Sequence, residues 1–408
     1  MQKLKIIDLF SGAGGLTFGF NYKLTDQGFV LRDEYEHIFA NEFDVNAVKA
    51  FRMNYPNSNM IEGDIRNITD EMLTEYIGTS DVDIIIGGPP CQSFSTVGQR
   101  KYDDRAKLSN EYLRILEKVK PKMFLFENVK GILSMKEIFY KTDDNGNILY
   151  EEVKCHRGEN EFTKKEPIID SYGELVIEKL KKEFDKMGYT IYVKTLCAAD
   201  FGVPQIRERV FIIGIRKDLS IEWEFPVGRS KRITIEEAIS DLPFVGEGEI
   251  KTEYDKQPST KYQFIMRNGS KDITEHYCGI YGDKIRTVIQ NVKEGQGKND
   301  FNALVDAGVI DERYRLTSGF ANTYGRLKRN EPSTTITNNL ATPSGLRCIH
   351  YEQDRALTPR EGARIQSFPD WYRFSGSRTD VARQVGNAVP PLLAIAFADK
   401  ITEILKNI

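Results

Sequence analysis

A cysteine and a carboxylate each follow an apolar run of this sequence. Cys91 stands between VDIIIGGPP and TVGQRKYDDRAK, and the second stretch is too polar for a core, although a lone cysteine is more often a small buried residue. Glu127 lies near the end of the next run, FLFENV, where a carboxylate is costly unless it is used. A thiol attacks when its own pKa is lowered or when an acid activates its electrophile. The two residues therefore predict nucleophilic catalysis in a cleft bordered by a loop.

Other cysteine chemistries find little support. The four histidines lie in segments that we predict to be peripheral, so a Cys-His protease pair is not expected. The five cysteines are odd in number, far apart and without a C-x-x-C pair, which argues against a disulfide framework and a thiolate zinc site. We therefore expect no metal site, and we expect the protein to be located in a reducing cytoplasm.

Three further strand ends carry residues suited to an adenosine. The first apolar run leads into DLFSGAGG, whose glycines let the backbone turn tightly beside a ligand. Gly12 and Gly14 fit a G-x-G-x-x-G dinucleotide fingerprint, but Thr17 takes the third glycine position, which weakens a pyrophosphate site. Glu42 ends a second run, where it suits ribose hydroxyls, and Asp64 follows a third, where it suits the adenine amino group. One such loop is often only a turn, but three in register favour a binding site.

An arginine pair precedes a later apolar run. Arg207 and Arg209 flank Glu208 just before VFIIGI, where an arginine fork can hold a planar, oxygen-bearing substrate or a phosphate. The alternative is a solvated strand end with a surface salt bridge. Further on, QVGNAVPP is by itself only a turn and the start of a helix.

Strands alternate with helices in the first part of the chain. From Leu4 to about residue 130, apolar runs such as LKIIDLF alternate with helical patterns such as DVNAVKAFRMNY and EYLRILEKV. This alternation implies parallel strands with right-handed crossovers, which predicts an α/β fold with a doubly wound, mostly parallel sheet. Ligands of such sheets bind beyond the carboxyl ends of the strands, where we expect the residues above to lie.

The remaining segments differ in composition. Residues 136–175 are densely charged, and an Asn-Gly turn between KTDD and ILYEEV predicts a hairpin in a surface insertion. Residues 219 to about 345 are rich in Gly, Pro, Asn and Ser, with helical patterns only at TIEEAISDL and KIRTVIQNV, which predicts a second, smaller, loop-rich domain. We expect about 346–379 to be a hinge and about 380–408 to return as helix to the first domain, which spans 1–218.

Length and charge set outer limits on function. The chain has 408 residues, enough for about two to three domains, and its 57 basic and 60 acidic residues give a net charge of −3. Hydrophobic residues make up 40%, which is typical of a globular protein and argues against disorder. No apolar run reaches about 18 residues, so neither membrane spanning nor export is expected. The net charge leaves nucleic-acid binding open, because such binding needs only a local basic surface.

Taken in order, the motifs resemble those of the cytosine-5 DNA methyltransferase family. They are D-L-F-x-G-x-G-G, N-E-F-D, G-D-I, G-G-P-P-C-Q-x-F-S, F-E-N-V, Q-x-R-E-R and G-N-A-V, and they cover residues 4 to about 216 and about 326 to 395. The resemblance implies a class I methyltransferase fold with S-adenosyl-L-methionine as the methyl donor. A glycine loop without its third glycine, together with acids for ribose and adenine, suits such a nucleoside without a pyrophosphate.

The resemblance also implies which residues bind this cofactor. Phe10 would stack on the adenine, Glu42 would hold the ribose, and Asp64 would take the adenine edge. Phe43 stands where some members have Trp, and Ala388 where some have Ser. The full expected set is Phe10, Gly12, Gly14, Gly15, Glu42, Phe43, Asp64, Ile65, Leu108, Asn387 and Ala388. Because the last two come from the C-terminal end, the last helix should pack on the first domain.

A catalytic set follows from the same resemblance. Cys91, preceded by Pro90 and ordered by Asn128, would add to carbon 6 of cytosine, while Glu127 would bond N3 and the exocyclic amine. Arg209 would bond the cytosine O2, and Arg207 would support it or a nearby phosphate. A duplex hides carbon 6, so the base must be flipped out. The loop closing behind it would act through Gln92, Ser95, Thr96, Val97, Gln99 and Arg100.

The resemblance makes residues 219 to about 345 a target recognition domain, and RLKRNEPSTTITNN resembles the motif that orders it. Solvated surface charge is the more frequent role for each candidate contact to phosphates or bases, which are Lys261, Arg267, Arg286, Lys328 and Arg329. We expect a monomeric, prokaryotic-type enzyme that is cytoplasmic, associates with the nucleoid and acts on double-stranded DNA. It would belong to a restriction-modification system, with a separate restriction endonuclease, or stand alone.

Three alternative functions are less well supported by the sequence. A tRNA cytosine-5 methyltransferase shares the catalytic motifs, but the long recognition region favours duplex DNA. A catalytically silent, DNA-binding member of the family is disfavoured by the intact Pro-Cys and Glu-Asn-Val motifs. An NAD-binding oxidoreductase is disfavoured by Thr17 and leaves the same two motifs unexplained.

Overall fold

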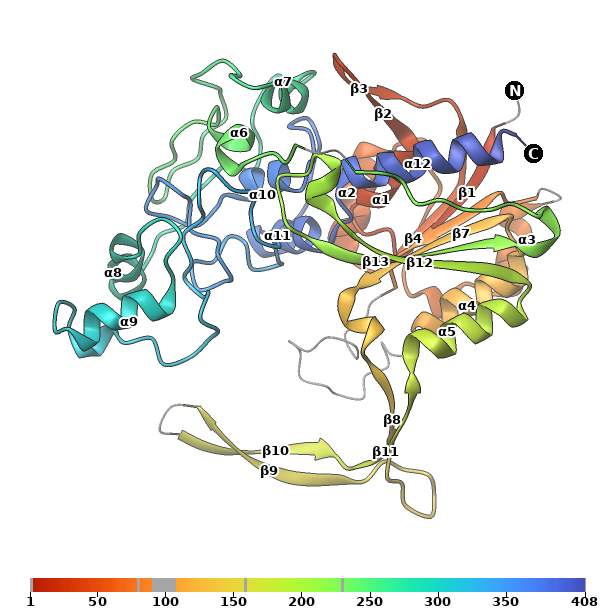
Figure 1. Ribbon diagram of the computed structural model, residues 1–408, viewed down its shortest axis with the longest axis horizontal. Coiled ribbons are helices and arrows are strands. Elements are labelled where there is room, and N and C mark those ends of the chain that lie inside the picture. The colour runs from red at the N-terminus through yellow and green to blue at the C-terminus, as the bar shows by residue number, and fades with distance from the viewer. Residues whose placement is uncertain (1–2, 79–80, 90–107, 158–159, 229–230, 408) are drawn as a thin grey trace. The chain divides into compact units, whose positions relative to one another are not determined.

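The computed structural model describes residues 3–78, 81–89, 108–157, 160–228 and 231–407 (Figure 1). The chain forms two compact units. Unit 1 comprises Met1–Asp64, Cys197–Arg207 and Phe225–Ile408, and unit 2 comprises Ile65–Leu196 and Glu208–Glu224. Within the described ranges, no helix combines the length and apolar character needed to cross a membrane.

Unit 1 contains a parallel sheet with the order β1-β4-β5. The strands are β1 (Leu4–Leu9), β4 (Tyr35–Glu42) and β5 (Met60–Glu62). β1 pairs in parallel with β4, and β4 with β5, so that Glu42 lies opposite Glu62. Residues 6–9 of β1 are at most 1% exposed, as expected for a strand covered on both faces. The predicted parallel arrangement is therefore confirmed for these strands. As expected, the glycine loop directly follows the carboxyl end of β1.

The other elements of unit 1 are mostly helices. They are α1 (Gly15–Asn21), β2 (Tyr22–Thr25), β3 (Gly28–Leu31), α2 (Val45–Asn54), η5 (Ala198–Phe201), α6 (Ile235–Ile239), α7 (Lys261–Arg267), α8 (Asp283–Asn291), α9 (Lys298–Asp306), η7 (Glu312–Tyr314), α10 (Pro359–Ile365), α11 (Arg378–Asn387) and α12 (Pro391–Leu405). The predicted packing of the last helix is confirmed, because α1 lies against α12 so closely that a Cβ on Gly19 would collide with the backbone of Ala394.

Two of these helices were not predicted. α6 and α8 match the expected helical patterns, whereas α7 and α9 span only seven and nine residues among turn-forming neighbours. Thr260 caps α7 by accepting the Gln263 N–H, and Tyr262 and Met266 form its buried stripe one turn apart. A pattern this short does not stand out from the punctuated sequence around it.

Unit 2 has the strand order β12-β13-β7-β6. β6 (Ile84–Gly87) and β7 (Met123–Val129) are parallel, whereas β13 (Glu208–Arg216) runs antiparallel to β7. The remaining elements of its body are η1 (Ile65–Asn67), α3 (Asp70–Ile77), α4 (Leu108–Val119), η4 (Lys130–Leu133), α5 (Val176–Lys186), β12 (Tyr189–Cys197) and η6 (Lys217–Leu219). β6 and residues 123–126 of β7 are buried, so these apolar runs are core strands as expected.

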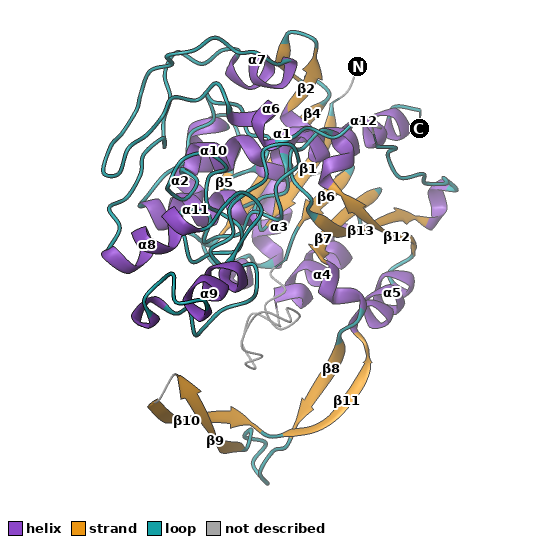
Figure 2. Cartoon of the chain, turned by 60° about the vertical axis from the view of Figure 1, so that its left-hand side comes forward, coloured by secondary structure: helices purple, strands orange, loops and turns teal. Residues whose placement is uncertain are grey.

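The predicted surface insertion is an arm of two β-ribbons in unit 2 (Figures 1 and 2). Its strands are β8 (Lys136–Tyr140), β9 (Tyr150–Arg157), β10 (Asn160–Pro167) and β11 (Ile169–Leu175). The Asn-Gly turn is present and is closed by an antiparallel bridge between Thr142 and Ile148. The predicted hairpin is confirmed around this turn but does not extend further, because β8 pairs with β11 and β9 pairs with β10.

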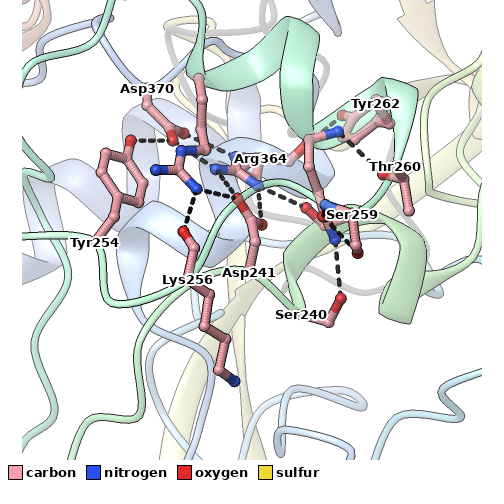
Figure 3. Close-up of polar contacts among 12 residues, drawn as sticks. Ser240, Asp241, Tyr254, Lys256, Ser259, Thr260, Tyr262, Arg364 and Asp370 are labelled. Carbon is pink, nitrogen blue, oxygen red and sulfur yellow. Dashed lines mark hydrogen bonds and ion pairs between the residues drawn. The ribbon is translucent and has the colours of Figure 1, made fainter.

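A buried ion network lies in unit 1 around α10 (Figure 3). Arg364 is fully buried and donates from Nη1 to Asp241 Oδ1 at 2.7 Å and from Nε to Asp370 Oδ1 at 2.8 Å. Tyr254 donates to Asp370 Oδ2 at 2.5 Å. Burial raises the pKa of Asp370, but the facing guanidinium outweighs it and holds that pKa low. The segment predicted as a hinge thus contains a helix anchored by charge pairs.

Candidate active site

The pairing of β7 with β13 brings a carboxylate and an arginine together in unit 2. Phe211 lies opposite Glu127 and Arg209 opposite Val129, two residues along each strand. Arg209 Nε lies 3.2 Å from Glu127 Oε1, and the two side chains are only 15% and 13% exposed. Burial lowers the pKa of Arg209, while the charge of Glu127 acts in the opposite direction. The strand end therefore presents a carboxylate with a partly desolvated counter-ion.

The segment leading to the cysteine is fixed beside this carboxylate. Asn128 Nδ2 donates to the carbonyl of Pro89 at 3.3 Å, and its Oδ1 accepts the Val129 N–H at 2.9 Å. A Cβ on Gly88 would lie 2.9 Å from Glu127 Oε2, so the two strand ends approach each other closely. The expected residues Pro90, Cys91, Gln92, Ser95, Thr96, Val97, Gln99 and Arg100 lie outside the described residues.

Arg207 is buried in unit 1. Its side chain donates from Nη1 to the carbonyl of Ile336 at 3.0 Å and from Nη2 to the carbonyl of Gly386 at 2.9 Å. Because the residue is only 2% exposed, the alternative of a solvated strand end is wrong for Arg207. Its guanidinium joins segments that lie 129 and 179 residues away in the sequence.

The glycine loop and β4 meet through a hydrogen bond in unit 1. Gly12 has a φ of +57°, and an added Cβ there would meet no atom within 4 Å, so the space above the loop is open. Its N–H donates to Glu42 Oε2 at 2.9 Å, and Glu42 Oε1 accepts the N–H groups of Phe43 and Asp44. Burial raises the pKa of Glu42, and these hydrogen bonds oppose that shift. Phe43 is 72% exposed beside them.

The C-terminal turn lies against the same loop. A Cβ on Gly15 would lie 2.6 Å from the carbonyl oxygen of Val389 and 2.9 Å from Ala388 Cβ. Asn387 is exposed at the end of α11 and Ala388 is half-buried. The structure therefore brings Ala388 to Gly15 across most of the chain. Gly14 lies over the ring of Tyr55, whose hydroxyl donates to the Gly14 carbonyl at 2.8 Å.

The remaining residues that the resemblance assigns to the cofactor lie in both units. Phe10 has a φ of +59° at the start of the glycine loop. Asp64 is half-buried and follows Gly63, where an added Cβ would again meet open space. In unit 2, Ile65 is only 2% exposed, and Leu108 is half-buried at the start of α4.

Sequence reasoning did not predict the contacts of three polar residues of unit 1, Asn41, Thr17 and Asp8. Asn41 is 1% exposed and donates from Nδ2 to the carbonyls of Ile61 and Gly63, which fixes the end of β5 to β4. Thr17 donates its hydroxyl to Asp8 Oδ2, while Asp8 Oδ1 is buried without a hydrogen-bond partner. Burial raises the pKa of Asp8 to about 8. The sequence signal that could have identified Asp8 is an acidic residue near the end of an apolar strand, which is the same pattern that identified Glu127.

The histidines are not all peripheral. His276 and His350 are 0% and 3% exposed, so that prediction is wrong for both. The ring nitrogens of His276 face Thr358 Oγ1 and the carbonyl of Pro243, each at 2.9 Å, and burial lowers the pKa of both histidines. Turn-rich flanks concealed this burial in the sequence. Among the described residues, no group of three or more His, Cys, Asp and Glu side chains could hold a metal ion.

The five candidate DNA contacts of unit 1 each have a carboxylate partner. The pairs are Lys261 with Asp26, Arg267 with Asp241, Arg286 with Glu247, Lys328 with Glu331, and Arg329 with Glu294. Apart from Arg267, whose side chain is 15% exposed, these basic side chains lie at the surface. Surface pairs of this kind are weak and exchange readily for other partners.

Comparisons with known proteins agree over nearly the whole chain. The family model of the C-5 cytosine-specific DNA methylases matches residues 4–145 and 166–403, and the gap between these ranges includes β9 and most of β10. The type II methyltransferase M.DdeI of Desulfomicrobium norvegicum is 34% identical, covering 99% of this chain and 90% of the relative. M.AgeI of Thalassovita gelatinovora is 31% identical, covering 98% of this chain and 99% of the relative.

Two solved structures share the fold. A putative DNA modification methyltransferase encoded within an E. coli prophage has a TM-score of 0.67 and 23% identity, covering 99% of this chain and 100% of its own. A DNMT2 variant of Spodoptera frugiperda has a TM-score of 0.52 and 16% identity, covering 98% and 100%. The predicted class I fold is thereby confirmed. The chain belongs to the family of C-5 cytosine-specific DNA methylases and is a DNA (cytosine-5-)-methyltransferase.

Proposed function

We propose that this enzyme transfers a methyl group from S-adenosyl-L-methionine to carbon 5 of a cytosine within a specific short duplex DNA sequence. The observation that carries the proposal is the Glu127–Arg209 pair beside Pro89, two residues before Cys91. A buried carboxylate with its own arginine, next to the segment that leads into a thiol, supplies groups for an acid-assisted nucleophilic addition.

The residues of the glycine loop fit the cofactor. Open space above Gly12 and Gly63 leaves room for a ligand at both strand ends. Glu42 is fixed by three backbone N–H groups, and its carboxylate oxygens keep acceptor capacity for the ribose hydroxyls. Phe10, Asp64 and Asn387 would complete the site. When bound, the cofactor supplies an electrophilic methyl group on a sulfonium.

The chain's own residues account for the remaining chemistry. The Cys91 thiolate forms a bond to carbon 6 of cytosine, which makes carbon 5 an enamine-like nucleophile. Glu127 hydrogen-bonds N3 and the exocyclic amine, and Arg209 hydrogen-bonds O2, so that charge developing on the ring is neutralised. After carbon 5 has taken the methyl group, water removes its proton and the bond to Cys91 breaks by elimination.

Access and specificity come from other parts of the chain. The target cytosine is flipped out of the duplex, because carbon 6 is covered within the stack. Residues 219 to about 345 read the sequence around it, and the loop after Cys91 closes behind the base. Because the relatives M.DdeI and M.AgeI are named type II methyltransferases, we propose a restriction-modification role with a separate endonuclease, and action as a cytoplasmic, nucleoid-associated monomer.

Bisulfite sequencing tests this proposal. Plasmid DNA is recovered from cells that express the wild-type chain or the Cys91→Ala variant as control. We expect protected cytosines in one short recurring sequence with the wild type and none with the variant. Soluble protein that binds S-adenosyl-L-methionine but protects no cytosine would contradict the proposal and favour a tRNA substrate or a silent binding role.

A further inference from the structure

A buried glutamine holds the turn that carries Asn387 and Ala388. Gln366 follows α10 and is 0% exposed. Its Nε2 donates to the carbonyl of Val385 at 2.7 Å and approaches the carbonyl of Ala388 at 3.4 Å. One amide group therefore forms hydrogen bonds to the turn on both sides of Asn387.

A second buried glutamine orients the first. Gln205 Nε2 donates to Gln366 Oε1 at 2.8 Å, and Gln205 Oε1 accepts the N–H of Ile336 at 2.8 Å. The two amides thus form a chain of hydrogen bonds from Ile336 to Val385. Each amide donates through nitrogen and accepts through oxygen, so the chain has one direction and each side chain one orientation. Both residues are 0% exposed, which shields these hydrogen bonds from solvent.

Two neighbouring hydrogen bonds also fix the turn. Arg207 Nη2 donates to the carbonyl of Gly386 at 2.9 Å, and Ser367 Oγ accepts the N–H of Leu392 at 3.1 Å. A Cβ on Gly386 would collide with the backbone of Thr337 and Asn338. Side chains from outside the turn therefore hold it, in addition to a long backbone hydrogen bond from the N–H of Ala388 to the carbonyl of Val385 at 3.4 Å.

We propose that Gln366 is a positioning residue for the cofactor. By holding the carbonyls of Val385 and Ala388, it fixes the turn at Asn387 and keeps Ala388 against Gly15 of the glycine loop. The inference rests on the proposed function, because that function assigns these residues to S-adenosyl-L-methionine. Losing the amide removes one donor from each of the two carbonyls and lets the turn shift, so cofactor affinity falls although Gln366 itself does not touch the ligand.

Titration calorimetry with S-adenosyl-L-methionine tests this role. Gln366→Met keeps the length of the side chain and removes its hydrogen bonds, and we expect the Kd to rise roughly tenfold, the scale of one lost buried hydrogen bond. In steady-state kinetics the KM for the cofactor rises, while the KM for DNA changes little.

Gln263→Met is the matched control. Gln263 is also 0% exposed in unit 1, and its amide donates to Ser240 and accepts from Ser259, neither of which belongs to the C-terminal turn. We expect Gln263→Met to lower thermal stability about as much as Gln366→Met while leaving the Kd unchanged. A general structural role for Gln366 predicts no such difference.

Several results would overturn the inference. These are an unchanged Kd in a folded Gln366→Met protein, or an equal rise in Gln263→Met. If Gln366→Met does not fold, Gln205→Met tests the same chain through the residue that orients Gln366, and an unchanged Kd there also overturns it. A wild-type protein that binds no S-adenosyl-L-methionine contradicts the proposed function itself, whereas equal binding by wild type and variant contradicts only the role of Gln366.

Discussion

At the scale of single residues, the two carboxylates proposed for function differ in what neutralises them. Glu127 has a guanidinium, that of Arg209, at 3.2 Å. Glu42 has backbone N–H groups from the glycine loop and from its own strand end. An ion pair places a positive charge beside Glu127, while backbone hydrogen bonds orient Glu42. We therefore propose a catalytic role for the glutamate of unit 2 and a cofactor-binding role for that of unit 1.

Replacing Glu42 tests the binding role. Glu42→Ala is expected to weaken S-adenosyl-L-methionine binding by about 1.5–3 kcal/mol, the range for a hydrogen bond to a charged group. Glu62→Ala is the matched control, because Glu62 pairs with Glu42 in the sheet register but forms an exposed ion pair with Arg52. Calorimetry measures both. Equal affinities for Glu42→Ala and wild type would remove Glu42 from the site.

Asp8 predicts a pH dependence of stability. Its pKa is raised by burial to about 8, from an ordinary value of 3.8, so the folded state keeps a proton that the unfolded chain loses between these values. Stability should therefore fall as the pH rises from about 4 to 8 and then level off. Urea unfolding at pH 5 and pH 8 should show a larger loss for the wild type than for Asp8→Asn. Parallel losses in the two proteins would show that Asp8 does not carry this effect.

At the scale of elements, the arm and α10 differ in how much each should contribute to the stability of the fold. The arm includes six of the large hydrophobic residues that the described structure exposes, and none of its described hydrophobic residues is buried. Its sequence, 136–175, holds ten acidic and six basic residues, which disfavours a role in contacting phosphates. α10, by contrast, is buried throughout and holds Arg364 between two carboxylates. Stability should depend on α10 and not on the arm.

Shortening the arm tests the first half of this contrast. Tyr140 and Ile169 are paired in the β8-β11 ribbon, so an Asn-Gly turn can join them in place of residues 141–168. We expect the free energy of unfolding to change by no more than about 0.5 kcal/mol, as for other surface changes. Cofactor affinity should stay the same. A large loss in urea unfolding would show that the arm supports the fold.

Removing the buried arginine tests the second half. Arg364→Met leaves Asp241 and Asp370 without their main counter-ion in a buried site and is expected to cost about 3–5 kcal/mol. Lys256→Met is the control, because only the backbone carbonyl of Lys256 joins the network, accepting from Arg267 (Figure 3). Thermal unfolding should separate the two variants widely. A small effect of Arg364→Met would contradict the importance of the network.

At the scale of the whole molecule, local motifs were predictable and long-range contacts were not. Strand ends such as those at Glu42 and Glu127 are visible in the sequence because an apolar run stops at a polar residue. The Gln205–Gln366 hydrogen bond joins residues 161 positions apart, and the Asp8–Thr17 bond spans a loop, and neither follows from periodicity. The insertion was recognisable by its charge, but the pairing of β9 with β10 depended on residues beyond the Asn-Gly turn.

The central claim is that Cys91 attacks carbon 6 of a flipped cytosine. Its most direct test uses duplex DNA with the target sequence found by bisulfite sequencing and 5-fluorocytosine at the methylated position. Fluorine replaces the proton that must leave carbon 5, so elimination is blocked and the covalent adduct accumulates. In the presence of S-adenosyl-L-methionine, we predict a complex that survives denaturing electrophoresis and whose modified peptide contains Cys91, with none formed by Cys91→Ser. An adduct on another residue, or no adduct from protein that methylates ordinary cytosine, would contradict the account.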